Sequence, residues 1–94
     1  MKYFVNRHHG AIAWAKQHLN IDVFVSHLDV KALEKGDEVY GTLPVNLAAK
    51  CCKKGARYFH LSLEVPETLR GQELSEAQME HLQATIQEYE IKEL

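Results

Sequence analysis

Basic and polar side chains crowd one short turn near the start of this chain, and their types suit phosphate chemistry. In the stretch "NRHHGA", Asn6, Arg7, His8 and His9 follow a short apolar run and precede Gly10, after which a helical pattern begins. A guanidinium binds phosphate through two parallel hydrogen bonds, and an imidazole moves protons near neutral pH. The free N–H groups at a helix N-terminus also favour an anion. We therefore expect this turn to bind a phosphate group.

A second turn, "GTLPVN", also lies between an apolar run and a helical pattern. It comprises Gly41, Thr42, Leu43 and Pro44, with Asn46 just inside the helix. Thr42 has two interpretations, as a hydroxyl that binds the anion or as the cap of its helix. Pro44 suits the first helical position, where its missing N–H costs nothing. Neither turn contains the phosphate-loop pattern with its lysine, and no G-x-G-x-x-G occurs.

Hydrophobic periodicity and turn residues predict the elements that must position these two turns. We expect strands over residues 2–5, 21–28, 38–43 and 56–65. Helices are expected over residues 11–19 and 44–54, with one helical turn between the second and third strands.

The last part of the chain is predicted to open with a helix. "SEAQ", from Ser75 to Gln78, is a capping box. A stripe of apolar residues at spacings of three, four and three then predicts one buried helix face, formed by Met79, Leu82, Ile86 and Tyr89. The final "EIKEL" is expected to be an edge strand or a tail.

Strands that alternate with helices predict one α/β domain over residues 1–94, with a mostly parallel sheet of four to five strands flanked by helices. The link between the second and third strands is short for a parallel crossover, so their pairing stays open. In such sheets, ligands bind beyond the carboxyl ends of the strands. His27, Ser62 and Arg70 also follow or end predicted strands. We expect them to join the two turns at one edge of the sheet.

Composition narrows the class of ligand. The net charge of −2 lacks the basic excess of proteins that grip long nucleic acids, so a nucleic-acid ligand is expected to be small. No apolar run approaches the ~20 residues that span a bilayer, and no signal peptide is recognisable, which predicts a cytoplasmic protein without membrane contact. The histidines show no metal-ligand spacing, so we expect neither metal nor cofactor. Adjacent Cys51 and Cys52 are poorly placed for a disulfide and are expected to be small buried residues.

Several candidates also have purely structural interpretations. Trp14 suits the core as well as the wall of a binding pocket, and Arg7 suits a surface ion pair. His60 lies inside an apolar strand and is expected to be structural. His18 and His81 lie on predicted helices and are expected at the surface.

Two motifs together carry a resemblance to a known family. The pattern R-H-x-G-A-x-x-W-A runs from Arg7 to Ala15, and G-T-L-P-V-x-L-A runs from Gly41 to Ala48. In this order they resemble the small stand-alone CRISPR-associated proteins found beside type III systems, a family grouped with the ring nucleases. The resemblance extends from Tyr3 to about Ser75. His9 falls at an x position of the first motif.

The resemblance implies a Rossmann-like (CARF-like) domain that forms a homodimer or a higher homo-oligomer. It implies that the ligand is cyclic tetra-adenylate, the second messenger of type III systems, and that the protein linearises it without a metal ion. Under this interpretation Arg7 binds phosphate, His8 transfers or orients a proton, and Thr42 binds the anion. The wider ligand-binding set is Asn6, His9, Gly10, Trp14, His27, Gly41, Leu43, Pro44, Asn46, Ser62 and Arg70.

Three hypotheses follow from the sequence. The first is a ring nuclease in which the 2′-OH of the RNA ring attacks the neighbouring phosphodiester. The second is a binding module that senses or sequesters the messenger without cleaving it. The third is a protein-interaction domain unrelated to nucleotides.

Overall fold

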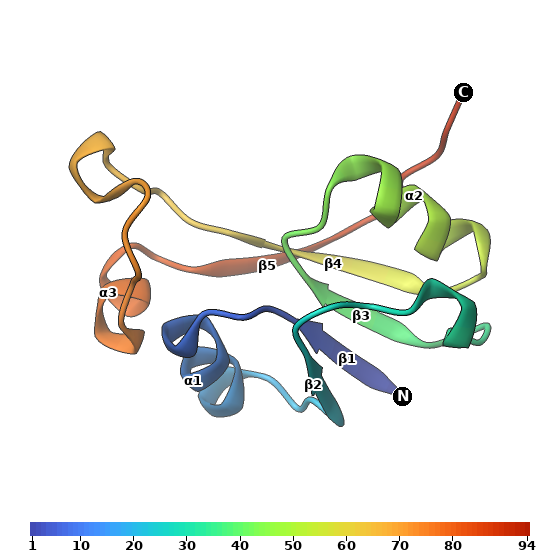
Figure 1. Cartoon of the computed structure of the whole chain (residues 1–94), viewed down its shortest axis with the longest axis horizontal. Coiled ribbons are helices and arrows are strands. Elements are labelled where there is room, and N and C mark those ends of the chain that lie inside the picture. Colours follow the sequence, from blue (N-terminus) through green and yellow to red (C-terminus); the bar gives the residue numbers. More distant parts are fainter.

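A computed structural model describes residues 1–94, and it contains one five-stranded sheet (Figure 1). Along the sheet the strands lie in the order β2 (Val23–Val25), β1 (Lys2–Val5), β3 (Glu38–Gly41), β4 (Arg57–Ser62) and β5 (Thr85–Tyr89). The first four strands pair in parallel, and β5 pairs with β4 in the antiparallel direction. The predicted α/β architecture with a mostly parallel sheet is therefore confirmed, and it is compatible with a Rossmann-like fold.

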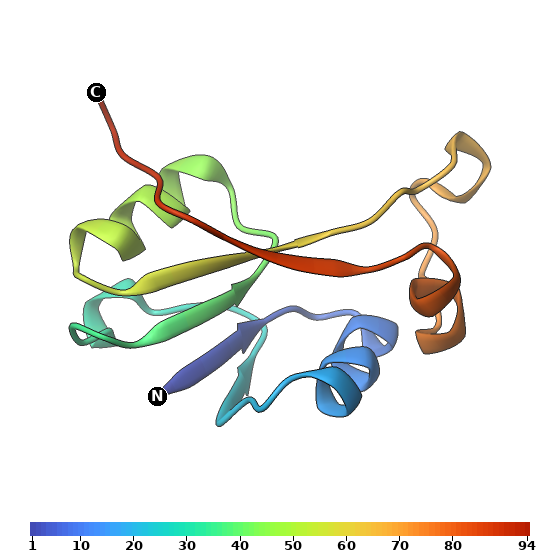
Figure 2. The same ribbon diagram turned by 180° about the vertical axis from the view of Figure 1, so that it is seen from behind.

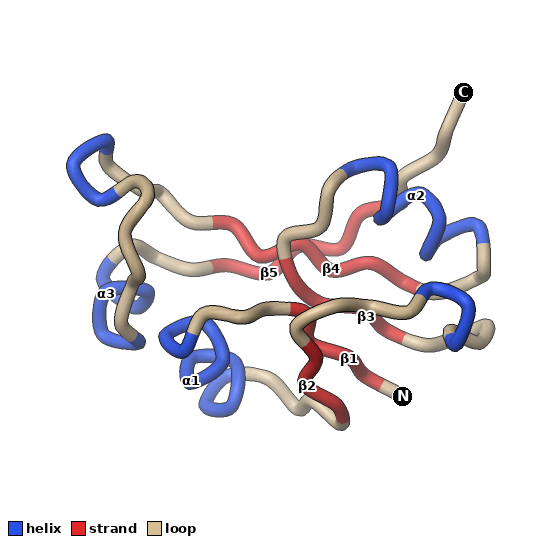
Figure 3. The backbone as a smooth tube through the Cα atoms, viewed as in Figure 1, coloured by secondary structure: helices blue, strands red, loops and turns tan.

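Three helices flank the sheet (Figure 3). They are α1 (His9–His18), α2 (Val45–Lys53) and α3 (Glu76–His81), and single 3₁₀ turns occupy Val30–Ala32 and Glu67–Leu69. Figures 1 and 2 show α1 and α3 together at one end of the molecule, whereas α2 and the C-terminus lie toward the other end. None of these helices is long and apolar enough to cross a membrane.

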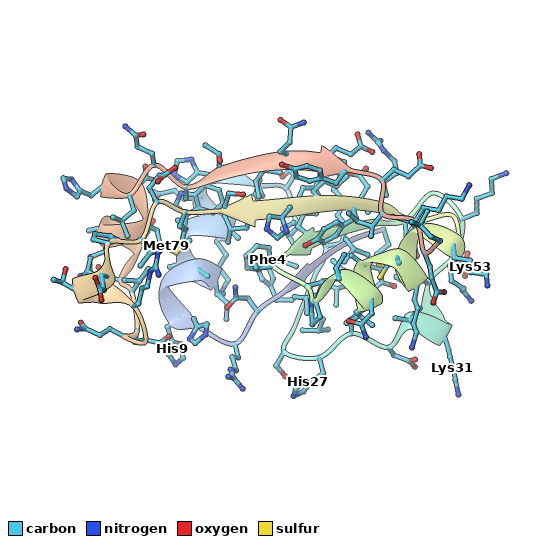
Figure 4. All side chains as sticks on the ribbon, turned by 90° about the horizontal axis from the view of Figure 1, so that it is seen from above. Phe4, His9, His27, Lys31, Lys53 and Met79 are labelled. Carbon is cyan, nitrogen blue, oxygen red and sulfur yellow. The ribbon has the colours of Figure 1, made fainter.

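The two faces of the sheet carry separate hydrophobic clusters because successive side chains of a strand point in opposite directions. On one face Phe4 packs with Trp14 of α1 and Met79 of α3. On the other face Val39 packs with Cys51 of α2. Figure 4 shows Phe4 and Met79 in the interior, with Lys31 and Lys53 at the periphery. These clusters fix α1 and α2 against opposite faces.

The sequence left open whether the second and third strands pair with each other. They do not, because β2 and β3 lie on either side of β1. The link from Ser26 to Asp37 must cross β1, and it does so with about the dozen residues that a parallel crossover needs. Its side chains Leu28, Val30 and Leu33 pack on the α2 face. The predicted helical turn lies within it, at Val30–Ala32.

The prediction of a long C-terminal helix from the apolar stripe is wrong. The capping box of Ser75 and Gln78 is present, but α3 ends at His81, and Gln83 has a positive φ of 57°. Ile86 pairs with Leu61, and Tyr89 pairs with Tyr58, as members of β5. The stripe spacing of three and four does not distinguish a helix from a short helix followed by a strand, and pairing with β4 decides in favour of the strand.

Other boundaries shift by a few residues. Helix α1 begins at His9, two residues before the predicted start, and Pro44 is the residue before α2 rather than its first. Strand β2 covers only Val23–Val25 of the predicted 21–28. Both cysteines are free thiols, and burial raises the pKa of Cys51 to about 11, so that it stays protonated and unreactive at neutral pH.

Candidate functional site

A cavity of about 840 Å³ opens at the carboxyl edge of the parallel strands, as the rule for open α/β sheets predicts. Side chains that follow four different strands form its polar wall: Asn6, Arg7 and His8 after β1, Ser26 and His27 after β2, Thr42 after β3, and Arg70 and Gln72 after β4. The remaining wall is largely aliphatic. The two turns singled out from the sequence therefore meet in one cavity.

The ionisable side chains of this cavity wall are all basic. Two arginines, Arg7 and Arg70, and two histidines, His8 and His27, line it, and no Asp or Glu does. Arg7 is exposed and forms no ion pair with a carboxylate, while Arg70 donates one hydrogen bond from Nε to the carbonyl of Val65 at 3.4 Å. Although the whole chain has a net charge of −2, this local excess of basic side chains favours an anionic ligand.

His8 is held at the start of α1 by contacts on both sides. Its backbone N–H donates to the side-chain oxygen of Asn6 at 2.8 Å, and its Nδ1 lies 2.8 and 2.9 Å from the two carboxylate oxygens of Glu73. The hydrogen bond to His8 lowers the pKa of Glu73 below its ordinary value. Because the ring has no other hydrogen-bonding partner, its Nε2 is available to a ligand. Sequence reasoning missed Glu73.

Thr42 lines the cavity without capping α2. Its hydroxyl donates to the carbonyl of Leu61 at 2.9 Å, and the capping position belongs to Pro44, which has no side-chain cap bond. The same turn is fixed by Tyr58, whose hydroxyl accepts from the Leu43 N–H at 3.0 Å. The Thr42 oxygen can still accept a hydrogen bond, while its proton is committed to Leu61.

His60, which was expected to be structural, contacts the hydroxyl of Tyr58. The Tyr58 hydroxyl lies 2.6 Å from Nδ1 of His60 and 3.2 Å from the carbonyl of Gly41. Gly41 itself serves strand packing, because a Cβ there would lie 2.7 Å from the carbonyl of Val5 and its φ is 152°. The surrounding turn is thus a tightly bonded corner of the sheet.

The segment from Leu63 to Leu74 forms the far wall of the cavity. It lies close to α1, since a Cβ on Gly10 would stand only 1.8 Å from the carbonyl oxygen of Leu74. Figures 1 and 2 show this segment projecting beyond the sheet before it returns to α3. No pattern in the sequence distinguishes it from an ordinary loop.

The cavity brings together eight of the candidate residues: Asn6, Arg7, His8, His27, Thr42, Leu43, Pro44 and Arg70. Six others lie outside its wall: His9, Gly10, Trp14, Gly41, Asn46 and Ser62. Trp14 is buried in the core, where it stacks on His18 at 4.9 Å between ring centroids. His9 is exposed beside His8, and Figure 4 shows it at the surface. No group of three or more His, Cys, Asp or Glu side chains is arranged to hold a metal ion.

Comparison with known proteins gives one match. Residues 3–92 match a family model described as "Putative CRISPR-associated protein (Cas_VVA1548)". No curated protein and no solved structure matches the chain.

Proposed function

We propose, because this chain belongs to the Cas_VVA1548 family of CRISPR-associated proteins, that it is a ring nuclease for a cyclic oligoadenylate. The expected ligand is cyclic tetra-adenylate, the messenger of type III CRISPR systems, and cleavage would switch off the antiviral signal. The protein would then act in the cytoplasm, where the messenger is made. The resemblance of the two sequence motifs to ring nucleases supports this choice of ligand.

One observation carries the proposal: Arg7, Arg70, His8 and His27 line a single cavity that contains no carboxylate. A cyclic oligoadenylate carries one negative charge for each phosphodiester and has no positive charge that a carboxylate would bind. Two guanidiniums suit its phosphates, because each can donate two hydrogen bonds to one phosphate.

The aliphatic walls of the cavity suit the adenine bases. More than half of the lining residues are hydrophobic, and Leu28, Leu43 and Leu69 are among them. A volume of about 840 Å³ lies within the ~300–1,000 Å³ of typical small-molecule sites, which also combine apolar walls with a few polar groups. Part of the ring would occupy this cavity, and a second copy of the chain would bind the other part.

The chemistry needs no external nucleophile, because RNA carries a 2′-hydroxyl. This oxygen attacks the adjacent phosphorus and the bond from phosphorus to the 5′-oxygen breaks. One new end then carries a 2′,3′-cyclic phosphate, and the departing 5′-oxygen takes a proton from solvent water to become a 5′-hydroxyl. His8 would take the proton of the 2′-hydroxyl, which typically contributes about 10²–10⁴-fold to the rate. Arg7 would stabilise the charge that develops on the phosphate oxygens, and Thr42 would help to position the ring.

Mass spectrometry of the products tests this function. Purified protein incubated with cyclic tetra-adenylate in excess chelator is expected to cleave each ring twice. The product, formed over many turnovers, is then linear di-adenylate with a terminal cyclic phosphate. A 3′-phosphate that appears first, or loss of activity on chelation, would contradict the scheme. Parallel incubations with cyclic tri- and hexa-adenylate define the preferred ring size.

A binding module that sequesters the messenger is the second candidate. The aliphatic character of the cavity wall favours binding as much as catalysis, and the Thr42 proton is already donated to Leu61. Recovery of intact ring, at no more than one equivalent per site, would identify this function.

A further inference from the structure

We propose that Glu73 positions His8 for proton transfer, so that the two residues form a histidine–carboxylate pair at the cavity. This inference rests on the proposed function and adds a residue to it. The observation behind it is the contact of Nδ1 of His8 with both Glu73 oxygens, at 2.8 and 2.9 Å, across 65 residues of sequence.

The contact assigns a role to each nitrogen of the imidazole. Glu73 can only accept a hydrogen bond when ionised, so Nδ1 must be the nitrogen that carries the proton. In the neutral ring Nε2 is then unprotonated, and no protein group bonds to it. Nε2 is therefore the atom that accepts the proton of the 2′-hydroxyl. As the ring becomes positively charged, the carboxylate beside it stabilises that charge.

The other charged and titratable groups that share the cavity wall with His8 are cationic or neutral. Arg7 precedes His8, and Arg70 and His27 share the cavity wall with it. His9 follows in the chain and also helps to lower the pKa of Glu73. Within this group of basic residues, the Glu73 carboxylate contacts the ring of His8, although Glu73 does not line the cavity itself.

A second histidine–carboxylate contact, at the opposite end of α1, provides a matched control. His18, at the end of α1, contacts Glu80 of α3 through Nε2. Both pairs join α1 to the segment that follows β4, and in both pairs the side chains are about half exposed. Only His8 lines the cavity. If Glu73 merely fastened the segment to α1, loss of Glu80 would have the same effect.

The experiment compares Glu73→Ala and Glu80→Ala with the unmodified protein. Nitrogen-15 NMR of the imidazoles reports the tautomer of His8 without any need for activity. Single-turnover cleavage and ring binding are measured on the same samples. Glu73→Ala is expected to shift His8 toward the Nε2-protonated tautomer and to slow cleavage by about 10- to 100-fold, with binding changed by less than about threefold. Glu80→Ala is expected to leave the tautomer and the rate unchanged.

Glu73→Gln adds a check of the same role, because it retains a hydrogen-bond acceptor without the charge. It is expected to retain the tautomer and to recover part of the rate. An unchanged His8 tautomer in Glu73→Ala would overturn the inference, as would equal losses of rate in Glu73→Ala and Glu80→Ala. In both cases the unmodified protein still cleaves the ring. If it does not cleave at all, the proposed function fails and this inference fails with it.

Discussion

The carbonyl oxygen of Leu74 occupies the space that a side chain at position 10 would need, since a Cβ on Gly10 would lie 1.8 Å from it. This contact joins the first turn of α1 to the far wall of the cavity. Gly10 therefore acts through packing, and the glycine of the first sequence motif has a steric explanation.

Gly10→Ala is expected to displace the segment from Leu63 to Leu74 and to destabilise the fold by about 1–3 kcal/mol, the usual cost of overpacking. Urea unfolding measures the loss, and limited proteolysis locates it. Gly36→Ala is a contrasting glycine variant, because a Cβ there meets nothing within 4 Å, although its positive φ adds some strain of its own. Faster proteolysis between Leu63 and Leu74 is expected only in the Gly10 variant.

Arg7→Ala is expected to weaken ring binding by roughly 1.5–3 kcal/mol, the scale of a hydrogen bond to a charged group. Its stability is expected to change little, because Arg7 forms no ion pair in the structure. Isothermal titration measures the affinity, and thermal melting measures the stability. Arg57→Ala is the control, since Arg57 pairs with Glu88 at 2.8 Å outside the cavity. Similar losses of affinity in both variants would indicate a general effect of charge.

His8→Ala is expected to slow single-turnover cleavage more than it weakens binding, because proton transfer matters mainly in the transition state. His9→Ala is expected to have the smaller effect on the rate, since His9 lies outside the cavity wall. Rapid-quench assays with labelled ring measure both rates. Equal effects of the two substitutions would leave general positioning as the better explanation.

Asp37 predicts a pH dependence of stability. This buried carboxylate accepts the Glu34 N–H at 2.9 Å and pairs with the chain N-terminus at 3.2 Å, and the first of these contacts is the largest cause of its lowered pKa. Because the folded pKa is lower than the unfolded one, the stabilisation is complete above about the ordinary value of 3.8 and disappears as the pH falls below it. Urea unfolding at pH 7 and pH 3 is expected to show a smaller acid-induced loss for Asp37→Asn than for the unmodified protein.

The protein is expected to self-associate. A chain of 94 residues has a small core, and a ring of repeated adenosines suits a two-fold axis that presents each cavity twice. Light scattering is expected to give the mass of a dimer or a dimer of dimers. A monomer both with and without cyclic tetra-adenylate would contradict a shared ring.

The parts of the fold that were predictable are those with local signals. Alternating strands and helices predicted the parallel sheet, and the pair Ser75 and Gln78 predicted the start of α3. The parallel topology predicted that the site would lie at the carboxyl edge of the sheet. Arg7, Thr42 and Arg70 were expected together for this reason, and they line the same cavity. Each of these inferences needs only neighbours in the sequence or a general rule of sheet architecture.

The parts that were missed depend on contacts between distant segments. Ile86 and Tyr89 fit a helical stripe, and only pairing with Leu61 and Tyr58 of β4 makes them a strand. Glu73 lies in a polar loop without periodicity, and its role is visible only once the chain has returned to His8. A single sequence carries no local signal for either contact.

The hydroxyl of Tyr58 has a consequence for the dynamics of binding. One phenol oxygen joins Gly41, Leu43 and His60, so the corner after β3 keeps its shape before any ligand arrives. The opposite wall is fastened to α1 at the half-exposed pair of His8 and Glu73. One wall of the cavity is therefore held through a buried hydroxyl, whereas the opposite wall is held by a half-exposed ion pair and by packing at Gly10. We expect the loss of conformational entropy on association to be larger for the opposite wall.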